Sequence, residues 1–292
     1  MAVSPCGAGR GFVTALKVLL ALWLALLLWG AAAVSPLRPA EPAGGAGAPP
    51  ESASPLRALV GPGERDPSGQ AAPDRARLLE ALEAGVEHYA TPLQLLGTAP
   101  YYSSRDALAA VLAYDAAVTA AAERYGVEKA MVQAVLFQEI RFLNLLDEVD
   151  HFVAAAHTYL QIREDWGQSS PQQRLPALPP AFRTDSSTGL GQIFAATAIR
   201  AVNWREGRTV YDAEDWHDLQ AVWDTLRNDN LYNIDMTALV LAYERSVLRE
   251  KNGTEPPAAD IMQAYNGSGP LSLRYREAVS EYYAAFQAYH GS

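Results

Sequence analysis

The sequence predicts an all-α domain over residues 74–292, preceded by an apolar segment (1–35) and a disordered linker (36–73). Three observations support this prediction. Helix-favouring Ala, Leu, Glu, Arg and Gln dominate from residue 74 onward. Apolar residues recur there at spacings of three and four, as on one face of a helix. No pair of alternating segments joined by a tight turn, which would indicate a β-hairpin, stands out.

The N-terminal segment has the pattern of an export signal. Arg10 and Lys17 precede 12 consecutive apolar residues (18–29), and three alanines follow at 31–33. This order is typical of a secretory signal peptide, whereas an apolar stretch read through Val34 approaches the length of a membrane span. A cleaved signal and an uncleaved membrane anchor therefore stay equal alternatives. Either one predicts that the rest of the chain is extracytoplasmic, secreted or anchored to the membrane.

The linker differs sharply from its neighbours in composition. Residues 36–73 hold nine of the 19 prolines, several glycines and few large apolar side chains. Such a stretch cannot bury enough apolar surface to offset the entropy lost on ordering. We therefore expect an extended Pro/Gly/Ala-rich spacer between the membrane and the domain.

The remainder is expected to form successive helices. Ser103, followed three residues later by Asp106, makes a capping box, which predicts a helix from there to Tyr125 that ends at Gly126. The next predicted helix spans 128–145. The others share the same apolar periodicity and span 75–89, 148–166, 191–203, 215–228, 231–251, 257–265 and 271–290. The interval 167–187, rich in Pro, Gln and Ser, is predicted to be a long loop.

Charge and residue usage exclude several classes of function. The net charge is −10, whereas nucleic-acid-binding domains are normally basic, so no nucleic-acid partner is expected. Cys6 is the only cysteine, which excludes a disulfide framework and a cysteine nucleophile in the domain. Glu148 and His151 share a helical face, but His157 does not, so no metal site is expected. No phosphate-binding loop or Gly-x-Ser-x-Gly motif occurs, and no cofactor is expected.

Glu139 is the strongest candidate for chemistry. It lies three or four residues from apolar neighbours on both sides, Leu136 and Phe142 among them, and so in the middle of an apolar helix face. Such surroundings favour the protonated carboxyl, the form that a general acid needs near neutral pH. From the helix position alone, a Glu paired with an arginine or placed at the rim of the core is the commoner case.

Three segments, taken together and in order, resemble the lytic transglycosylase family, whose lysozyme-like domain is shared with goose-type lysozymes. They are AVLFQE (134–139), STGLGQI (187–193) and QAYNGSG (263–269). The resemblance covers about residues 122–269. The sequence departs from the family where Ile140 replaces the usual Ser after the glutamate, and where 50 positions separate Glu139 from Gly189. This long insertion would form a wall or lid of the groove.

The resemblance implies a lysozyme-like fold and peptidoglycan glycan strands as the partner. Glu139 would be the catalytic acid and base in cleavage of the bond between N-acetylmuramic acid and N-acetylglucosamine. Tyr265 would lie against the Glu139 carboxyl. The implied substrate-binding residues are Gly189, Leu190, Gly191, Gln192, Tyr265 and Asn266.

The type of cleavage depends on whether a second carboxylate takes part. Ordinary glycosidases use two carboxyl groups, whereas a transglycosylase uses one, and the 6-hydroxyl of the muramic acid closes a 1,6-anhydro ring. Acidic residues near the motifs are Asp147, Glu148, Asp150 and Asp185. Because no motif pairs any of them with Glu139, we favour the transglycosylase. The alternatives are a hydrolytic muramidase, a non-catalytic wall-binding or scaffold module, and a helical export component.

Overall fold

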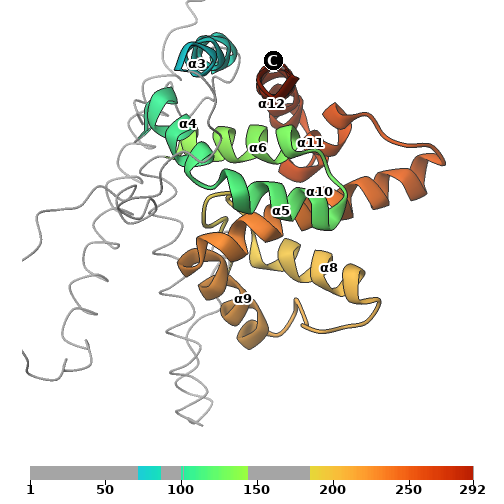
Figure 1. Cartoon of the computed structure of the whole chain (residues 1–292). Coiled ribbons are helices and arrows are strands. Elements are labelled where there is room, and N and C mark those ends of the chain that lie inside the picture. The colour runs from blue at the N-terminus through green and yellow to red at the C-terminus, as the bar shows by residue number, and fades with distance from the viewer. Residues whose placement is uncertain (1–71, 87–99, 101, 144–184, 292) are drawn as a thin grey trace, which may run out of the picture. The chain divides into compact units, whose positions relative to one another are not determined.

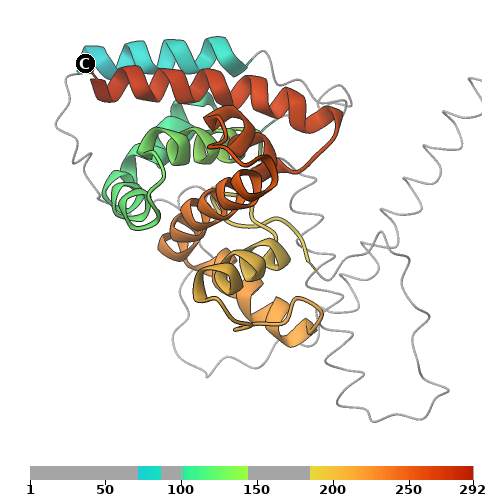
Figure 2. The ribbon, with the colours of Figure 1, turned by 90° about the vertical axis from the view of Figure 1, so that its right-hand side faces the viewer.

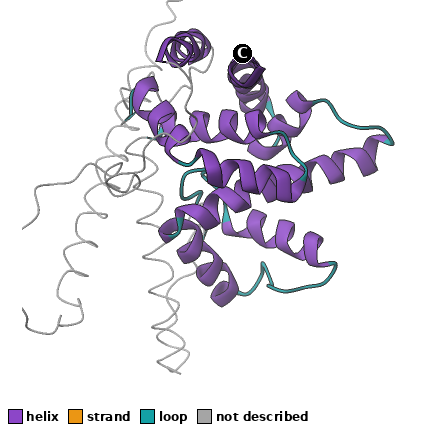
Figure 3. Cartoon of the chain, viewed as in Figure 1, coloured by secondary structure: helices purple, strands orange, loops and turns teal. Residues whose placement is uncertain are grey.

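The computed structural model describes residues 72–86, 100, 102–143 and 185–291 (Figure 1). Its elements are α3 (Ala72–Val86), α4 (Ser104–Ala113), α5 (Asp115–Tyr125), α6 (Lys129–Phe142), α8 (Ala195–Glu206), α9 (Trp216–Asn228), α10 (Asn230–Asn252), α11 (Ala258–Asn266) and α12 (Pro270–Gly291). All lie in the compact unit Ala53–Ser292. In these ranges the elements are helices, and the paired β geometry is one isolated bridge between Thr188 and Ile193 (Figure 3).

The predicted all-α class is confirmed for the described part of the chain. The predicted signal or anchor segment, nearly all of the linker and the helix predicted at 148–166 lie outside the described residues. None of the described helices is both long enough and apolar enough to cross a membrane.

The capping box at the start of α4 is confirmed, but the single helix predicted from 103 to 125 is wrong. Ser103 Oγ accepts the N–H of Asp106 at 3.2 Å, and Asp106 Oδ2 accepts the N–H of Ser103 at 3.2 Å. The helix breaks at Tyr114, whose φ of −101° and ψ of 19° are not helical. Tertiary contacts set this break. The Tyr114 hydroxyl accepts a hydrogen bond from Asn230 at 2.9 Å, and the buried carboxylate of Asp115 pairs with Lys129 at 2.6 Å.

The helix predicted from residue 191 also begins later, at Ala195. Asp185 explains the start, because its two carboxylate oxygens accept the N–H groups of Ala195 and Ala196, each at 2.8 Å. The preceding residues form a turn closed by the bridge between Thr188 and Ile193. The other predicted helices that fall on described residues agree with α3, α6, α9, α10, α11 and α12, within a few residues at their ends.

The last helix organises one side of the packing. α12 packs against α6, α11 and α3, and Figure 2 shows α3 running alongside it. Phe137 of α6 meets Tyr282 of α12 edge to face, with ring centroids 4.9 Å apart, and Phe286 at 6.5 Å. Such edge contacts between aromatic rings add to the gain from burial. They hold α6 and α12 in register, which matters for the site below.

Two clusters of buried side chains form the core. One gathers α3, α4, α5, α6, α11 and α12, and the other gathers α8, α9 and α10. The long helix α10 contributes to both, with Ile234 and Leu241 in the first and Leu239 and Val240 in the second. Since α10 is apolar on opposite faces, it is buried between the two clusters. Tyr265 packs against both, so it lies where they meet.

Candidate functional site

Glu139 stands out from its own helix by its exposure. Residues 130–138 and 140 of α6 are all buried, so this helix is covered on all sides. The prediction of a single apolar stripe on it is therefore wrong. Glu139 alone in this stretch is partly exposed. Its carboxyl group is therefore attached to a rigid, buried helix and remains within reach of a ligand.

A tyrosine of the last helix contacts this carboxylate directly. The hydroxyl of Tyr275 donates a hydrogen bond to Glu139 Oε1 at 2.7 Å. Tyr275 is buried, with 1% of its surface exposed, and the aromatic contacts between α6 and α12 hold the two helices together. A hydrogen bond to a charged acceptor is stronger than one between neutral groups, and it orients the carboxylate.

Sequence reasoning missed Tyr275, because nothing local distinguishes it from the rest of the 14 tyrosines in the chain. It was Tyr265 that the motif resemblance placed against the Glu139 carboxyl. In the structure the hydroxyl of Tyr265 instead donates to the carbonyl oxygen of Gly191 at 2.6 Å. Only the packing of α12 on α6 brings position 275 to the glutamate.

The charge of Glu139 also acts on Tyr265. Burial raises the pKa of Tyr265 well above its ordinary value, and the negative charge of Glu139 raises it further. The phenol therefore remains a hydrogen-bond donor at any ordinary pH. Through the hydrogen bond of its hydroxyl to Gly191, Tyr265 joins the end of α11 to the turn, although the two are far apart in the sequence.

The turn at 187–193 is held by a buried asparagine of α10. Asn233 Oδ1 accepts the N–H of Gly191 at 2.7 Å, and Asn233 Nδ2 donates to the carbonyl oxygens of Thr188 at 3.0 Å and Leu226 at 3.1 Å. Asn233 has no exposed surface. Its amide satisfies three backbone groups that would otherwise be buried without partners, so it fixes the conformation of the turn.

Both glycines of the turn are required by this close packing. At Gly189, where φ is +74°, a Cβ would lie 2.0 Å from Asn233 Nδ2. At Gly191 a Cβ would lie 2.2 Å from Thr237 Oγ1 and 2.9 Å from the Tyr265 hydroxyl. Only glycine lets the turn approach α10 and Tyr265 so closely.

Gln192 follows with an unusual backbone. Its φ of 46° lies in the left-handed region, which a residue with a side chain adopts at a cost. The side chain is held in place: Gln192 Oε1 accepts from Ser187 Oγ at 3.1 Å, and Nε2 donates to the Gly189 carbonyl at 2.8 Å. Gln192 as a residue is partly exposed.

Two other residues implied by the resemblance lie apart from this group. The Leu190 side chain is 1% exposed and belongs to the larger core cluster, so it supports the turn from inside. Asn266 is exposed at the last position of α11, where Gly267 ends the helix with a φ of 102°.

A second carboxylate near the turn is already engaged. Asp185 caps α8 with both oxygens, so it serves a structural purpose. Asp147, Glu148 and Asp150 lie outside the described residues. Among the residues that the structure describes, no three His, Cys, Asp or Glu side chains are grouped so that they could hold a metal ion.

In comparisons with protein-family models, curated proteins and solved structures, nothing matches this chain.

Proposed function

We propose that this chain is an extracytoplasmic peptidoglycan lytic transglycosylase with a lysozyme-like helical domain. It cleaves the bond between N-acetylmuramic acid and N-acetylglucosamine and leaves a 1,6-anhydro ring on the muramic acid. Glu139 is its single acid and base. The apolar N-terminal segment directs the chain out of the cytoplasm, as a cleaved signal or as an anchor.

One observation supports this proposal above the others. Glu139 is the partly exposed position of a buried stretch of α6, and Tyr275 donates to its carboxylate at 2.7 Å. Tyr265, which feels the charge of Glu139, donates to the turn that carries Gln192. A carboxyl group held by a buried hydroxyl beside a rigid polar turn suits a general acid that must meet one oxygen of a polymer.

The proposed reaction needs one proton donor and no activated water. The Glu139 carboxyl gives its proton to the glycosidic oxygen, and the bond from that oxygen to C1 of the muramic acid breaks. The Glu139 carboxylate then takes the proton of the muramic acid 6-hydroxyl, whose oxygen forms the new bond to C1. Tyr275 donates to the carboxylate in this second half, when the carboxylate bears its negative charge.

Two amide side chains that the motif resemblance implies, one in the turn and one at the end of α11, suit recognition of the sugar. Gln192 and Asn266 each offer both a donor and an acceptor, which matches the acetamido groups of both sugars. The use of a single acid agrees with the engagement of Asp185 at the start of α8.

The test is mass spectrometry of soluble products after the full-length chain is incubated with purified peptidoglycan. The matched control is Glu139→Gln, which keeps the size and removes the acid. We expect products ending in 1,6-anhydromuramic acid from the parent and none from the variant, with no fall in the melting temperature of the variant. Products with ordinary reducing ends would instead identify a hydrolase. Absence of products from both proteins, with retained sedimentation on the wall polymer, would identify a binding module.

A further inference from the structure

A polar pocket lies between the C-terminal end of α8, the following loop and α10. Its volume is about 310 Å³, and its lining includes Arg205, Arg208, Tyr211 and Tyr232 together with apolar Val202 and Met236. This volume is at the lower end of the range for small-molecule sites, which are typically apolar with a few converging polar groups. None of these residues contributes to the Glu139 site.

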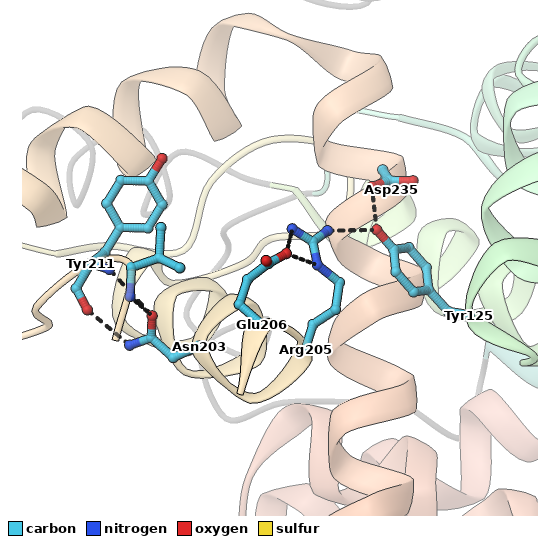
Figure 4. A network of polar contacts seen from close by, with 7 residues as sticks. Tyr125, Asn203, Arg205, Glu206, Tyr211 and Asp235 are labelled. Atoms are coloured by element: carbon cyan, nitrogen blue, oxygen red, sulfur yellow. Dashed lines mark hydrogen bonds and ion pairs between the residues drawn. The ribbon is translucent and has the colours of Figure 1, made fainter. Parts of the chain in front are cut away.

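The loop that forms one wall is fixed in place. Asn203 Oδ1 accepts the N–H of Val210 at 2.7 Å and of Tyr211 at 3.2 Å, and Asn203 Nδ2 donates to the Tyr211 carbonyl at 2.8 Å (Figure 4). Three hydrogen bonds from one side chain hold the backbone of the loop against α8. The backbone that carries the Tyr211 ring is therefore fixed beside the pocket.

The acidic groups of the pocket are already paired. Asp235 accepts from the Tyr125 hydroxyl at 2.7 Å and forms an ion pair with Arg124. Glu206 accepts from Arg205, which also donates to the Tyr125 hydroxyl at 3.2 Å, as Figure 4 shows. Asp235, Glu206 and Arg205 therefore each have a partner within this network.

Three donors of the lining remain free. Within the part of the chain that the structure describes, Arg208 makes no hydrogen bond or ion pair, and neither do the hydroxyls of Tyr211 and Tyr232. The pKa of Tyr232 is raised to about 12, mainly because the side chain is buried and to a smaller extent because of the neighbouring Tyr211. Tyr232 is therefore a donor at physiological pH, and both phenols line the same pocket.

We propose that this pocket binds the terminal carboxylate of a short peptide, with Arg208 as its cationic partner. A guanidinium matches a carboxylate with two parallel hydrogen bonds, and two phenol hydroxyls complete the donor set. One free positive charge balances a monoanion. Arg205, the other arginine of the lining, is engaged with Glu206, so this lining has no second free cation for a dianion such as phosphate. Val202, Val210 and Met236 suit a small aliphatic side chain beside the carboxylate.

The binding does not require the proposed transglycosylase activity, although that activity would supply a natural source in the peptides of the wall polymer. The chirality of the peptide separates two sources. A preference for D-alanine at the end would indicate wall peptides, and a preference for L-alanine would indicate the end of an ordinary polypeptide. Either preference retains the pocket and its carboxylate chemistry.

The experiment is isothermal titration calorimetry of the full-length chain in detergent with N-acetyl-D-Ala-D-Ala, its L,L enantiomer and the C-terminal amide of each. We expect saturable binding of at least one acid, with its amide weaker by about 10-fold or more, because a paired charged hydrogen bond is lost. Arg208→Gln should weaken the acid by a similar factor. Arg249→Gln, which removes an exposed arginine of α10 outside the pocket, should leave the affinity for the acid unchanged.

Equal affinity for acid and amide, parent-like binding by Arg208→Gln, or no saturable binding of any acid would each overturn the proposal. Glu139→Gln should bind the peptide as the parent does. A protein that binds the peptide but yields no anhydro product would therefore contradict the transglycosylase alone. A protein that yields the product but binds no peptide would contradict the pocket alone.

Discussion

Gly191→Ala should disrupt the turn beside Glu139 by crowding α10. The new Cβ would lie 2.2 Å from Thr237 Oγ1, 2.9 Å from the Tyr265 hydroxyl and 3.3 Å from Asn233 Oδ1. Ordinary contact begins at 3.4 Å, so the turn or Thr237 must move by about 1.2 Å. Both sides are buried and hydrogen-bonded, so neither moves freely.

The cost follows from two contributions. Overpacking by one methyl group in a well-packed core typically costs about 1–3 kcal/mol. Weakening the hydrogen bond from the Gly191 N–H to Asn233 costs about 1 kcal/mol more. We therefore expect a loss of about 2–4 kcal/mol in the free energy of unfolding, which lowers the melting temperature by roughly 5–15 °C. Activity should fall too, because the Cβ displaces Tyr265.

The assay is thermal and urea unfolding of the full-length chain, arranged as a double-mutant cycle with Thr237→Ala. Thr237→Ala removes the nearest atom, so the double variant should recover about 1–2 kcal/mol relative to the sum of the two single changes. The control is Gly291→Ala, whose Cβ would meet nothing within 4 Å. A Gly191→Ala variant as stable as the control, or strict additivity in the cycle, would refute the close approach.

Three further predictions test the site and its surroundings. Tyr275→Phe removes the donor to Glu139, so kcat for anhydro-product release should fall about 10- to 100-fold with little change in melting temperature, and an unchanged kcat would show that this hydrogen bond is not used. Asp185→Asn removes one of two carboxylate acceptors at the start of α8, so unfolding should become easier by roughly 1 kcal/mol while activity is retained; a loss of activity as large as that of Glu139→Gln would make Asp185 a second acid. Burial raises the pKa of Glu244 above 4.5, and Arg200 partly opposes it, so the folded state binds this proton more tightly than the unfolded state does. The contribution of Glu244 to stability is therefore greatest below pH 4.5 and declines as the pH rises through the folded pKa. Glu244→Gln should match the parent in acid and unfold at a higher temperature near neutral pH. Parallel pH profiles of the two melting temperatures would contradict this.

Local chemistry made much of the fold predictable. The capping box at Ser103 and the stop at Gly126 were correct because each depends on groups within one helical turn. The break at Tyr114 was not predictable, since it depends on contacts with Asn230 and Lys129, which lie far along the chain. The same holds for the start of α8, which depends on a carboxylate ten residues earlier.

The sequence by itself determined the helical class of the described region and singled out Glu139, because apolar spacing and residue types are local properties. The tertiary structure alone decided which hydroxyl reaches that glutamate. Tyr265 and Tyr275 both lie in helical patterns near the C-terminus. The packing of α12 on α6 brings the Tyr275 hydroxyl to the carboxylate, whereas the Tyr265 hydroxyl donates to the Gly191 carbonyl in the turn. Hydrogen bonds between segments far apart in sequence arise only once helices pack, and no periodicity encodes them.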